Sequence, residues 1–191
     1  MTRLHTGRLV LTPIDAGVTP GHPTVLLKRL QEIGLISGQL GSDADKFLAG
    51  EKFIWLIDFM GCSPSIQLEP TSSGEPFCHL KVSGPYPKPL FLWGRNTTPP
   101  HCEKCRKRIP DWRPIMEAWK ATPNNYQAKC PHCAHRQSPQ RYNWRQSAGC
   151  GRFLLLLENI FPQEAIPSPI LMKSLQEASE NQPWHYFYVQ E

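Results

Sequence analysis

Long apolar runs are missing from this sequence. The longest, residues 53–57 and 153–157, have five residues each, whereas a helix that spans a bilayer needs about 20. The first eight residues contain no continuous apolar segment of the kind found in secretory signal peptides. We therefore expect a cytoplasmic protein that is not embedded in a membrane.

Charged residues are also scarce, at 19%, while hydrophobic residues make up 40% of the 191. That balance excludes a wholly disordered chain, and a chain of this length can bury a substantial core. The 20 prolines are about twice the usual share of roughly 5%. The composition therefore predicts a compact fold with many fixed loops.

Acidic residues are few in one segment in particular. Residues 101–152 hold eleven Lys or Arg but only three acids, a net charge of +8, whereas the rest of the chain holds ten bases and thirteen acids. Such an uneven distribution is typical of a segment that contacts an anionic partner. The alternative is that these side chains only keep a small module in solution.

Recognisable catalytic groupings are absent as well. The sequence has no phosphate-binding glycine loop, no acid–base pair and no Ser/His/Asp grouping, which favours a binding protein over an enzyme. One catalytic alternative uses Cys62, which follows an apolar run, with His79 or His185 as its base. The other interpretation is that Cys62 is an ordinary buried cysteine.

The hydrophobic pattern predicts an α+β fold with a mixed or antiparallel sheet and two or three packed helices. One amphipathic helix is expected from Pro23 to Gly34, and another after an N-cap at Ser168. Strands are expected at residues 9–11, 53–60, 77–83, 90–93, 153–158 and 184–189.

Two of these expectations are specific. Residues 53–60 are nearly all apolar and predict a central strand buried on both faces. Proline- and glycine-rich loops separate this segment from the next two strands, which predicts an antiparallel meander of the three. Residues 1–94 and 151–191 are expected to form one body, with residues 95–150 inserted as a module.

Four of the seven cysteines form two closely spaced pairs, Cys102 with Cys105 and Cys130 with Cys133. A gap of two residues lets both thiolates of a tight turn point at one ion, and two such turns complete a tetrahedron. The pairs are 24 residues apart, slightly more than the usual spacing of about 15–20. The pattern predicts one structural Zn²⁺ with no open coordination position.

Other arrangements of the cysteines are less consistent with the sequence. An odd number of cysteines without a secretion signal argues against a disulfide framework, while an iron–sulfur centre is the alternative that four thiolates leave open. His101, His132 and His135 lie beside the expected ligands and are the residues that could replace one. Of the other cysteines, Cys78 is expected in the core, and Cys150 stands in a tight turn between two glycines.

Residues 101–136 resemble a zinc-ribbon module, most clearly in the run Cys-Pro-His-Cys-Ala-His that begins at Cys130. The resemblance implies a closed structural zinc site held by the four cysteines. Arg106 and Ala134 depart from it, because glycine is frequent directly after the second cysteine of each pair. The linker should contain a helix over residues 111–121 that packs over the site through Ile115, Met116 and Trp119.

Basic and aromatic residues alternate around the cysteines, which predicts a surface that binds nucleic acid, because arginine pairs with phosphates and aromatic rings stack on unpaired bases. The candidate residues are Lys104, Arg106, Lys107, Arg108, Arg136, Arg141, Tyr142, Trp144 and Arg145. Trp144 has a second interpretation, as an anchor in the core of the module.

We therefore expect a non-enzymatic zinc-containing binding or adaptor protein, a component of a larger complex. Its basic module should contact RNA, DNA or an acidic protein surface. The main alternative is a purely protein–protein assembly factor with a structural zinc, to which the proline-fixed loops and six tryptophans would be suited.

Overall fold

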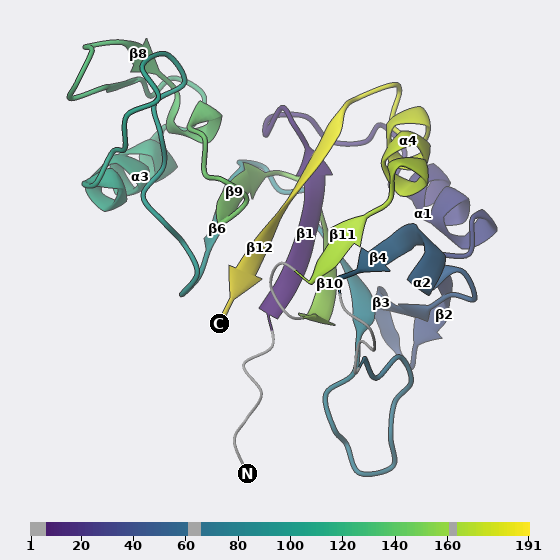
Figure 1. The fold of residues 1–191 in the computed structure, drawn as a ribbon. Helices are drawn as coiled ribbons and strands as arrows, with labels where there is room; N and C mark the ends of the chain where they lie inside the picture. Colours follow the sequence, from purple (N-terminus) through teal and green to yellow (C-terminus); the bar gives the residue numbers. More distant parts are fainter. Residues whose placement is uncertain (1–6, 61–65, 161–163) are drawn as a thin grey trace.

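The centre of the protein is a six-stranded sheet. The structure, a computed structural model, describes residues 7–60, 66–160 and 164–191. Every neighbouring pair of strands in the large sheet is antiparallel. In spatial order the strands are β12 (Trp184–Gln190), β1 (Gly7–Pro13), β10 (Leu154–Ile160), β5 (His79–Ser83), β3 (Asp43–Ala49) and β2 (Ile36–Leu40). Together with the helices, this sheet confirms the α+β class (Figure 1).

Helices cover one face of the sheet. They are α1 (Pro23–Glu32), α2 (Phe53–Leu56) and α4 (Pro169–Glu177), whose buried side chains share one core with the sheet strands. The expected N-cap is present, since the Ser168 hydroxyl accepts a hydrogen bond from the N–H of Leu171 at 3.3 Å. None of the helices in the described residues is long and apolar enough to cross a bilayer.

A second, smaller core lies on the opposite face. It contains Val10 of β1, Leu154 and Leu156 of β10, and Phe187 and Val189 of β12. Strands β1 and β10 are therefore buried on both sides. This two-sided burial explains why residues 153–157 are apolar at every position.

The cysteine-bearing segment leaves and re-enters the body at one place. The strands β6 (Leu90–Trp93) and β9 (Ala148–Gly151) pair with each other to form a two-stranded ladder. We call residues 95–150 the cysteine module and the remainder the body. The module contains α3 (Trp112–Ala121), the strand pair β7 (Ala128–Lys129) and β8 (Arg136–Gln137), and the 3-10 turn η1 (Pro139–Arg141).

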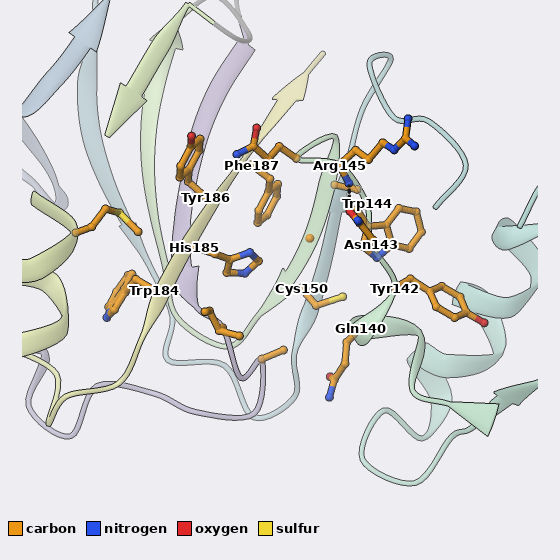
Figure 2. Close-up of a pocket in the computed structure, with 16 residues that line it drawn as sticks. Gln140, Tyr142, Asn143, Trp144, Arg145, Cys150, Trp184, His185, Tyr186 and Phe187 are labelled. Atoms are coloured by element: carbon orange, nitrogen blue, oxygen red, sulfur yellow. Dashed lines mark hydrogen bonds between the residues drawn. The ribbon is translucent and has the colours of Figure 1, made fainter. Parts of the chain in front are cut away.

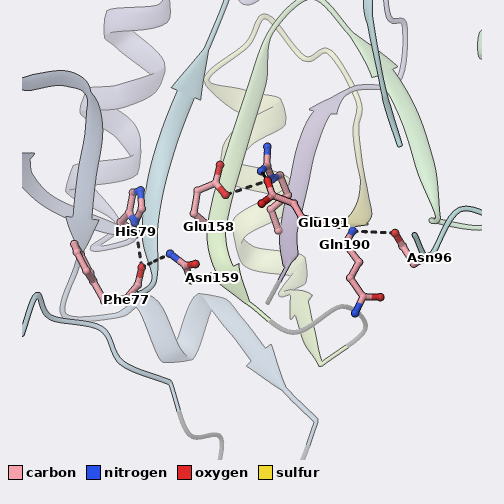
Figure 3. A network of polar contacts seen from close by, with 8 residues as sticks. Phe77, His79, Asn96, Glu158, Asn159, Gln190 and Glu191 are labelled. Carbon is pink, nitrogen blue, oxygen red and sulfur yellow. Dashed lines mark hydrogen bonds and ion pairs between the residues drawn. The ribbon is translucent and has the colours of Figure 1, made fainter. Parts of the chain in front are cut away.

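The cysteine module is attached along the outer edge of β12. The Arg95 N–H donates to the Gln190 carbonyl at 2.9 Å, and the Gln190 N–H donates to Asn96 Oδ1 at the same distance (Figure 3). Further along the strand, the Tyr188 N–H donates to the Gln146 carbonyl at 2.8 Å. These bonds leave the module projecting from one side of the sheet, away from α1 and α4 (Figure 1).

The prediction of a central strand over residues 53–60 is wrong. The segment is the short helix α2 followed by β4 (Ile57–Phe59), which pairs only with β11 (Ala165–Pro167) in a small separate sheet. Ile54 and Trp55 are 56% and 75% exposed. The buried positions are therefore 53, 56 and 57, which is a helical spacing that an entirely apolar run conceals.

The predicted meander is also wrong. β4 pairs with β11, β5 with β10 and β3, and β6 with β9, so the three strands belong to three sheets. Chain order misleads here because each of these strands pairs with a segment that is distant in sequence. The hairpin of β2 and β3 was not predicted from the sequence. A two-residue turn joins its strands, and Gly41 in this turn has a φ of 59°.

Candidate metal centre and the basic surface around it

The two cysteine pairs lie on turns with matching backbone hydrogen bonds. In the first turn the Arg106 N–H donates to the Cys102 carbonyl at 2.9 Å, and in the second the Ala134 N–H donates to the Cys130 carbonyl at 3.0 Å. Arg106 and Ala134 have φ values of 58° and 59°, a left-handed conformation that costs side-chain-bearing residues energy. The knuckle geometry is therefore reached without glycine.

The four sulfur atoms fit one metal ion. All four lie within 4.8 Å of one another, with Sγ–Sγ distances of 3.8 Å for Cys102 and Cys133 and 3.7 Å for Cys105 and Cys130. A metal–sulfur bond of about 2.3 Å in a regular tetrahedron gives sulfur separations of about 3.8 Å. A disulfide would need about 2.05 Å, so the arrangement fits a shared ion and not a cross-link.

Hydrogen bonds stabilise negative sulfur at this site. Burial raises the pKa of the Cys130 thiol, but N–H groups of His132 and Cys133 and the neighbouring thiols outweigh it and lower the pKa to about 6. The His132 N–H lies 3.4 Å from Cys130 Sγ. A thiol that ionises this readily is suited to ligate a metal near neutral pH.

The predicted linker helix is present as α3 and lies next to the cysteines. Its side chains Trp112, Met116 and Trp119 are buried in one cluster with Cys102 and Cys130. Ile115 is only partly buried at the edge of this cluster. Cys102 and Cys130 are therefore enclosed among apolar side chains, whereas Cys105 and Cys133 are half-buried.

The three histidines beside the cysteines do not join the sulfur cluster. Within the described residues the potential ligand group contains the four cysteines alone. The His132 ring contacts the Arg108 carbonyl through Nε2 at 2.9 Å. His101 is buried, and this burial together with the charges of Arg145 and Arg108 lowers its pKa.

Five of the predicted basic residues gather around two adjacent hollows beside the first knuckle. Arg106, Arg141 and Arg145 line one of about 250 Å³, which we call the arginine hollow. Lys104 and Arg136 line its neighbour, which shares Arg141 with it. Lys107 and Arg108 are exposed but line neither.

Charge in the arginine hollow is only partly neutralised. Arg141 pairs with Glu103 at 2.9 Å. Neither Arg106 nor Arg145 makes an ion pair with any residue that the structure describes. The Arg145 N–H donates to Asn143 Oδ1 at 3.0 Å and its φ is 49°, so its backbone is held in a left-handed turn. The hollow therefore offers free guanidinium groups on a constrained backbone.

The two predicted stacking residues are not available at the surface. Tyr142 and Trp144 are 4% and 5% exposed, and both belong to the core of the cysteine module. The Trp144 ring packs against Phe91 and Trp112 at centroid distances of 4.9 and 5.3 Å. The burial supports the second interpretation of Trp144, that of a core anchor.

The remaining cysteines do not form an accessible catalytic group in the described residues. Cys62 lies outside those residues. Cys78 is buried, as expected, and burial raises its pKa to about 12. Cys150 is also buried, and its pKa is raised for the same reason. A neutral, enclosed thiol is a poor nucleophile.

The two histidines proposed as bases lie in different places. His79 is half-buried on β5, with Nδ1 3.1 Å from the Phe77 carbonyl (Figure 3). His185 is on β12 beside the cysteine module. The sequence did not place either histidine in a pocket, because the surroundings of each ring depend on how distant strands pair.

Comparison with known proteins adds no relative to this description. No protein-family model, no curated protein and no solved structure matches the chain.

Proposed function

We propose that the cysteine module is a zinc-stabilised unit that binds the phosphate backbone of a nucleic acid. The observation that carries the proposal is the convergence of Arg106, Arg141 and Arg145 on one hollow directly beside the Cys102 knuckle. Arginine is the side chain best suited to phosphate, because its planar donors form paired hydrogen bonds with two oxygens.

Zinc is the ion that the donor set favours. Four thiolates at tetrahedral separation suit Zn²⁺ or an iron–sulfur centre, and the two-residue spacing in paired knuckles is typical of structural zinc. Bound there, the ion would cross-link the two turns and supply folding energy to the segment. Because Cys102, Cys105, Cys130 and Cys133 would occupy all four positions, its role would be structural.

A nucleic acid is supported by charge as well as by geometry. The segment 101–152 carries a net charge of +8, and the arginines of the hollow are exposed. Phosphate contacts of this kind position a nucleic acid without reading its sequence. An acidic protein surface is the competing partner. Its negative groups do not have the regular spacing of the phosphates along a nucleic acid strand.

The test is salt-dependent binding of a nucleic acid by the metal-loaded full chain. Each phosphate neutralised on a single strand contributes a slope of about −0.7 in log affinity against log salt. Three arginine contacts then predict a loss of roughly 20-fold between 50 and 200 mM salt. The readout is fluorescence anisotropy of a labelled ten-nucleotide strand at several salt concentrations.

Charge reversal identifies the surface. Arg106→Glu should weaken binding and lower the salt slope, whereas Lys28→Glu, on the exposed side of α1, is the matched control and should leave both unchanged. Absence of binding at 50 mM salt, or binding that is unchanged by Arg106→Glu, contradicts the proposal.

Elemental analysis of the purified protein should find one zinc per chain, and iron in its place would overturn the assignment of the metal.

A further inference from the structure

A third hollow lies where the cysteine module meets the body. Its volume is about 390 Å³, within the range of sites that enclose small ligands. Figure 2 shows His185 and Phe187 of β12 projecting toward Cys150 of β9, with Asn143 and Arg145 of the module on the opposite side. We call it the junction hollow. No motif in the sequence indicates it, because its walls come from segments that are distant in the chain, namely residues 140–150 and 184–187 with Ile14, Ala16 and Met172.

The junction hollow borders the arginine hollow. Asn143 and Arg145 line both. A strand whose phosphates contact Arg106 and Arg145 therefore has the junction hollow within its reach. The shared lining indicates that a ligand of the junction hollow would belong to the same strand that the arginine hollow binds.

The lining of the junction hollow combines a planar ring with polar groups. His185 is half-buried, and its ring lies 6.0 Å from that of Phe187. Its Nε2 is enclosed and has no hydrogen-bond partner among the residues that the structure describes. Burial lowers the pKa of His185, which favours the neutral imidazole. The side-chain amides of Asn143 and Gln140 line the same space.

The backbone of β12 adds a donor and an acceptor. The Tyr188 and Gln190 N–H groups point outward to Gln146 and Asn96. Antiparallel pairing with β1 continues without a bulge to Tyr186. Because such pairing alternates along a strand, the N–H and carbonyl of Tyr186 also point away from β1, at the edge that borders the junction hollow.

We propose that the junction hollow binds one unpaired base of a single-stranded nucleic acid whose phosphates lie on the arginine hollow. The inference rests on the proposed function and adds a substrate class to it. An unpaired base offers a planar face for the His185 ring and a polar edge for amide and backbone groups, which is how proteins hold single strands. A duplex keeps its bases stacked and would use only the arginine hollow.

The experiment compares two probes of equal charge, a ten-residue thymidylate strand and an abasic strand with the same number of phosphates. Stacking of one base is worth about a 5-fold or greater change in affinity, so the metal-loaded full chain should prefer thymidylate by at least that factor. His185→Leu, which keeps the bulk but removes the planar ring, should abolish most of this preference. His185→Phe, which restores a planar ring, should recover most of it.

The abasic strand separates the two proposals. Its affinity should be the same for the native protein and both His185 variants, which also shows that the variants fold. If neither strand binds with salt dependence, the proposed function fails. If both strands bind equally to the native protein, or if His185→Leu keeps the preference for thymidylate, the phosphate surface stands and the base site is overturned.

Discussion

Arg106 and Ala134 are the residues at which this chain departs most clearly from the zinc-ribbon pattern. Both adopt the left-handed conformation that glycine usually supplies. Their backbone N–H groups complete the hydrogen bonds of the two turns at 2.9 and 3.0 Å. The strain is tolerated because each turn is held by these bonds and would be held by the ligated metal.

Ala134→Gly should therefore stabilise the metal-loaded protein. Removing Cβ at φ 59° relieves a strain of about 1 kcal/mol, reduced by the greater freedom of glycine in the unfolded chain. The measurement is urea unfolding with saturating zinc, followed by tryptophan fluorescence. Ala134→Val is the matched variant and should destabilise the protein, and a loss of stability with glycine would contradict the geometry of the turn.

The burial of Cys78 predicts that the folded protein loses stability in alkaline solution. The Cys78 thiol has a pKa of about 12 in the folded protein, compared with an ordinary value of 9.0. The folded state keeps the proton longer, so the stabilisation is complete below pH 9 and is lost as the pH rises from 9 to 12. Cys78→Val should make the unfolding free energy less sensitive to pH in that interval, by up to about 1.4 kcal/mol per pH unit. Equal slopes for both proteins between pH 9 and 11 would show that Cys78 is not enclosed.

At the scale of elements, the β6–β9 ladder determines how the cysteine module meets the body. Gly149 of β9 lies against β12, and a Cβ built on it would collide with the ring of Phe187. The neighbouring Gly151 is equally close to Thr12 of β1. The two glycines thus allow the ladder to lie directly on the sheet, which explains the Gly-Cys-Gly run.

Gly149→Ala should destabilise the protein by about 1–3 kcal/mol, because the aromatic ring and the ladder must separate. Gly38→Ala is the matched control, since nothing lies within 4 Å of a Cβ at Gly38 of β2. Thermal unfolding of the two variants provides the comparison. Similar transition temperatures for both would mean that β9 does not pack on Phe187.

At the scale of the whole molecule, the side chains around the cysteines form a buried cluster distinct from the largest one, and this cluster also takes in Ala16 and Phe91 of the body. The largest cluster of buried side chains contains no cysteine of the proposed metal site, whereas the module's cluster contains Cys102 and Cys130. The two parts are joined by the β6–β9 ladder and by hydrogen bonds to β12. Local unfolding of the module at lower cost than the whole is therefore expected.

Cys102→Ser should unfold the cysteine module and leave the body folded. Losing one thiolate removes both a ligand and the metal's contribution to folding. Hydrogen exchange by mass spectrometry should show protection lost in α3 and retained in β1 and β10. If β10 loses protection as readily as α3, the two parts form one cooperative unit and the division into body and insertion is wrong.

The sequence alone determined what depends on local pattern. Helices α1, α3 and α4 were predicted because polar residues interrupt their apolar positions at helical spacing, and the grouping of the four cysteines was predicted because two tight turns with a short fixed spacing can bring their sulfur atoms together. The Cys62 hypothesis and the partner remain predictions.

Tertiary structure decided the rest. Whether residues 53–57 form a helix depended on which side chains the body could cover, and an all-apolar run carries no sign of that. Burial of Trp144 depended on the packing of Phe91 and Trp112 against it. The junction hollow around His185 depended on β9 and β12 meeting across the chain. Such contacts arise from the packing of distant segments, and local sequence does not record which segments will meet.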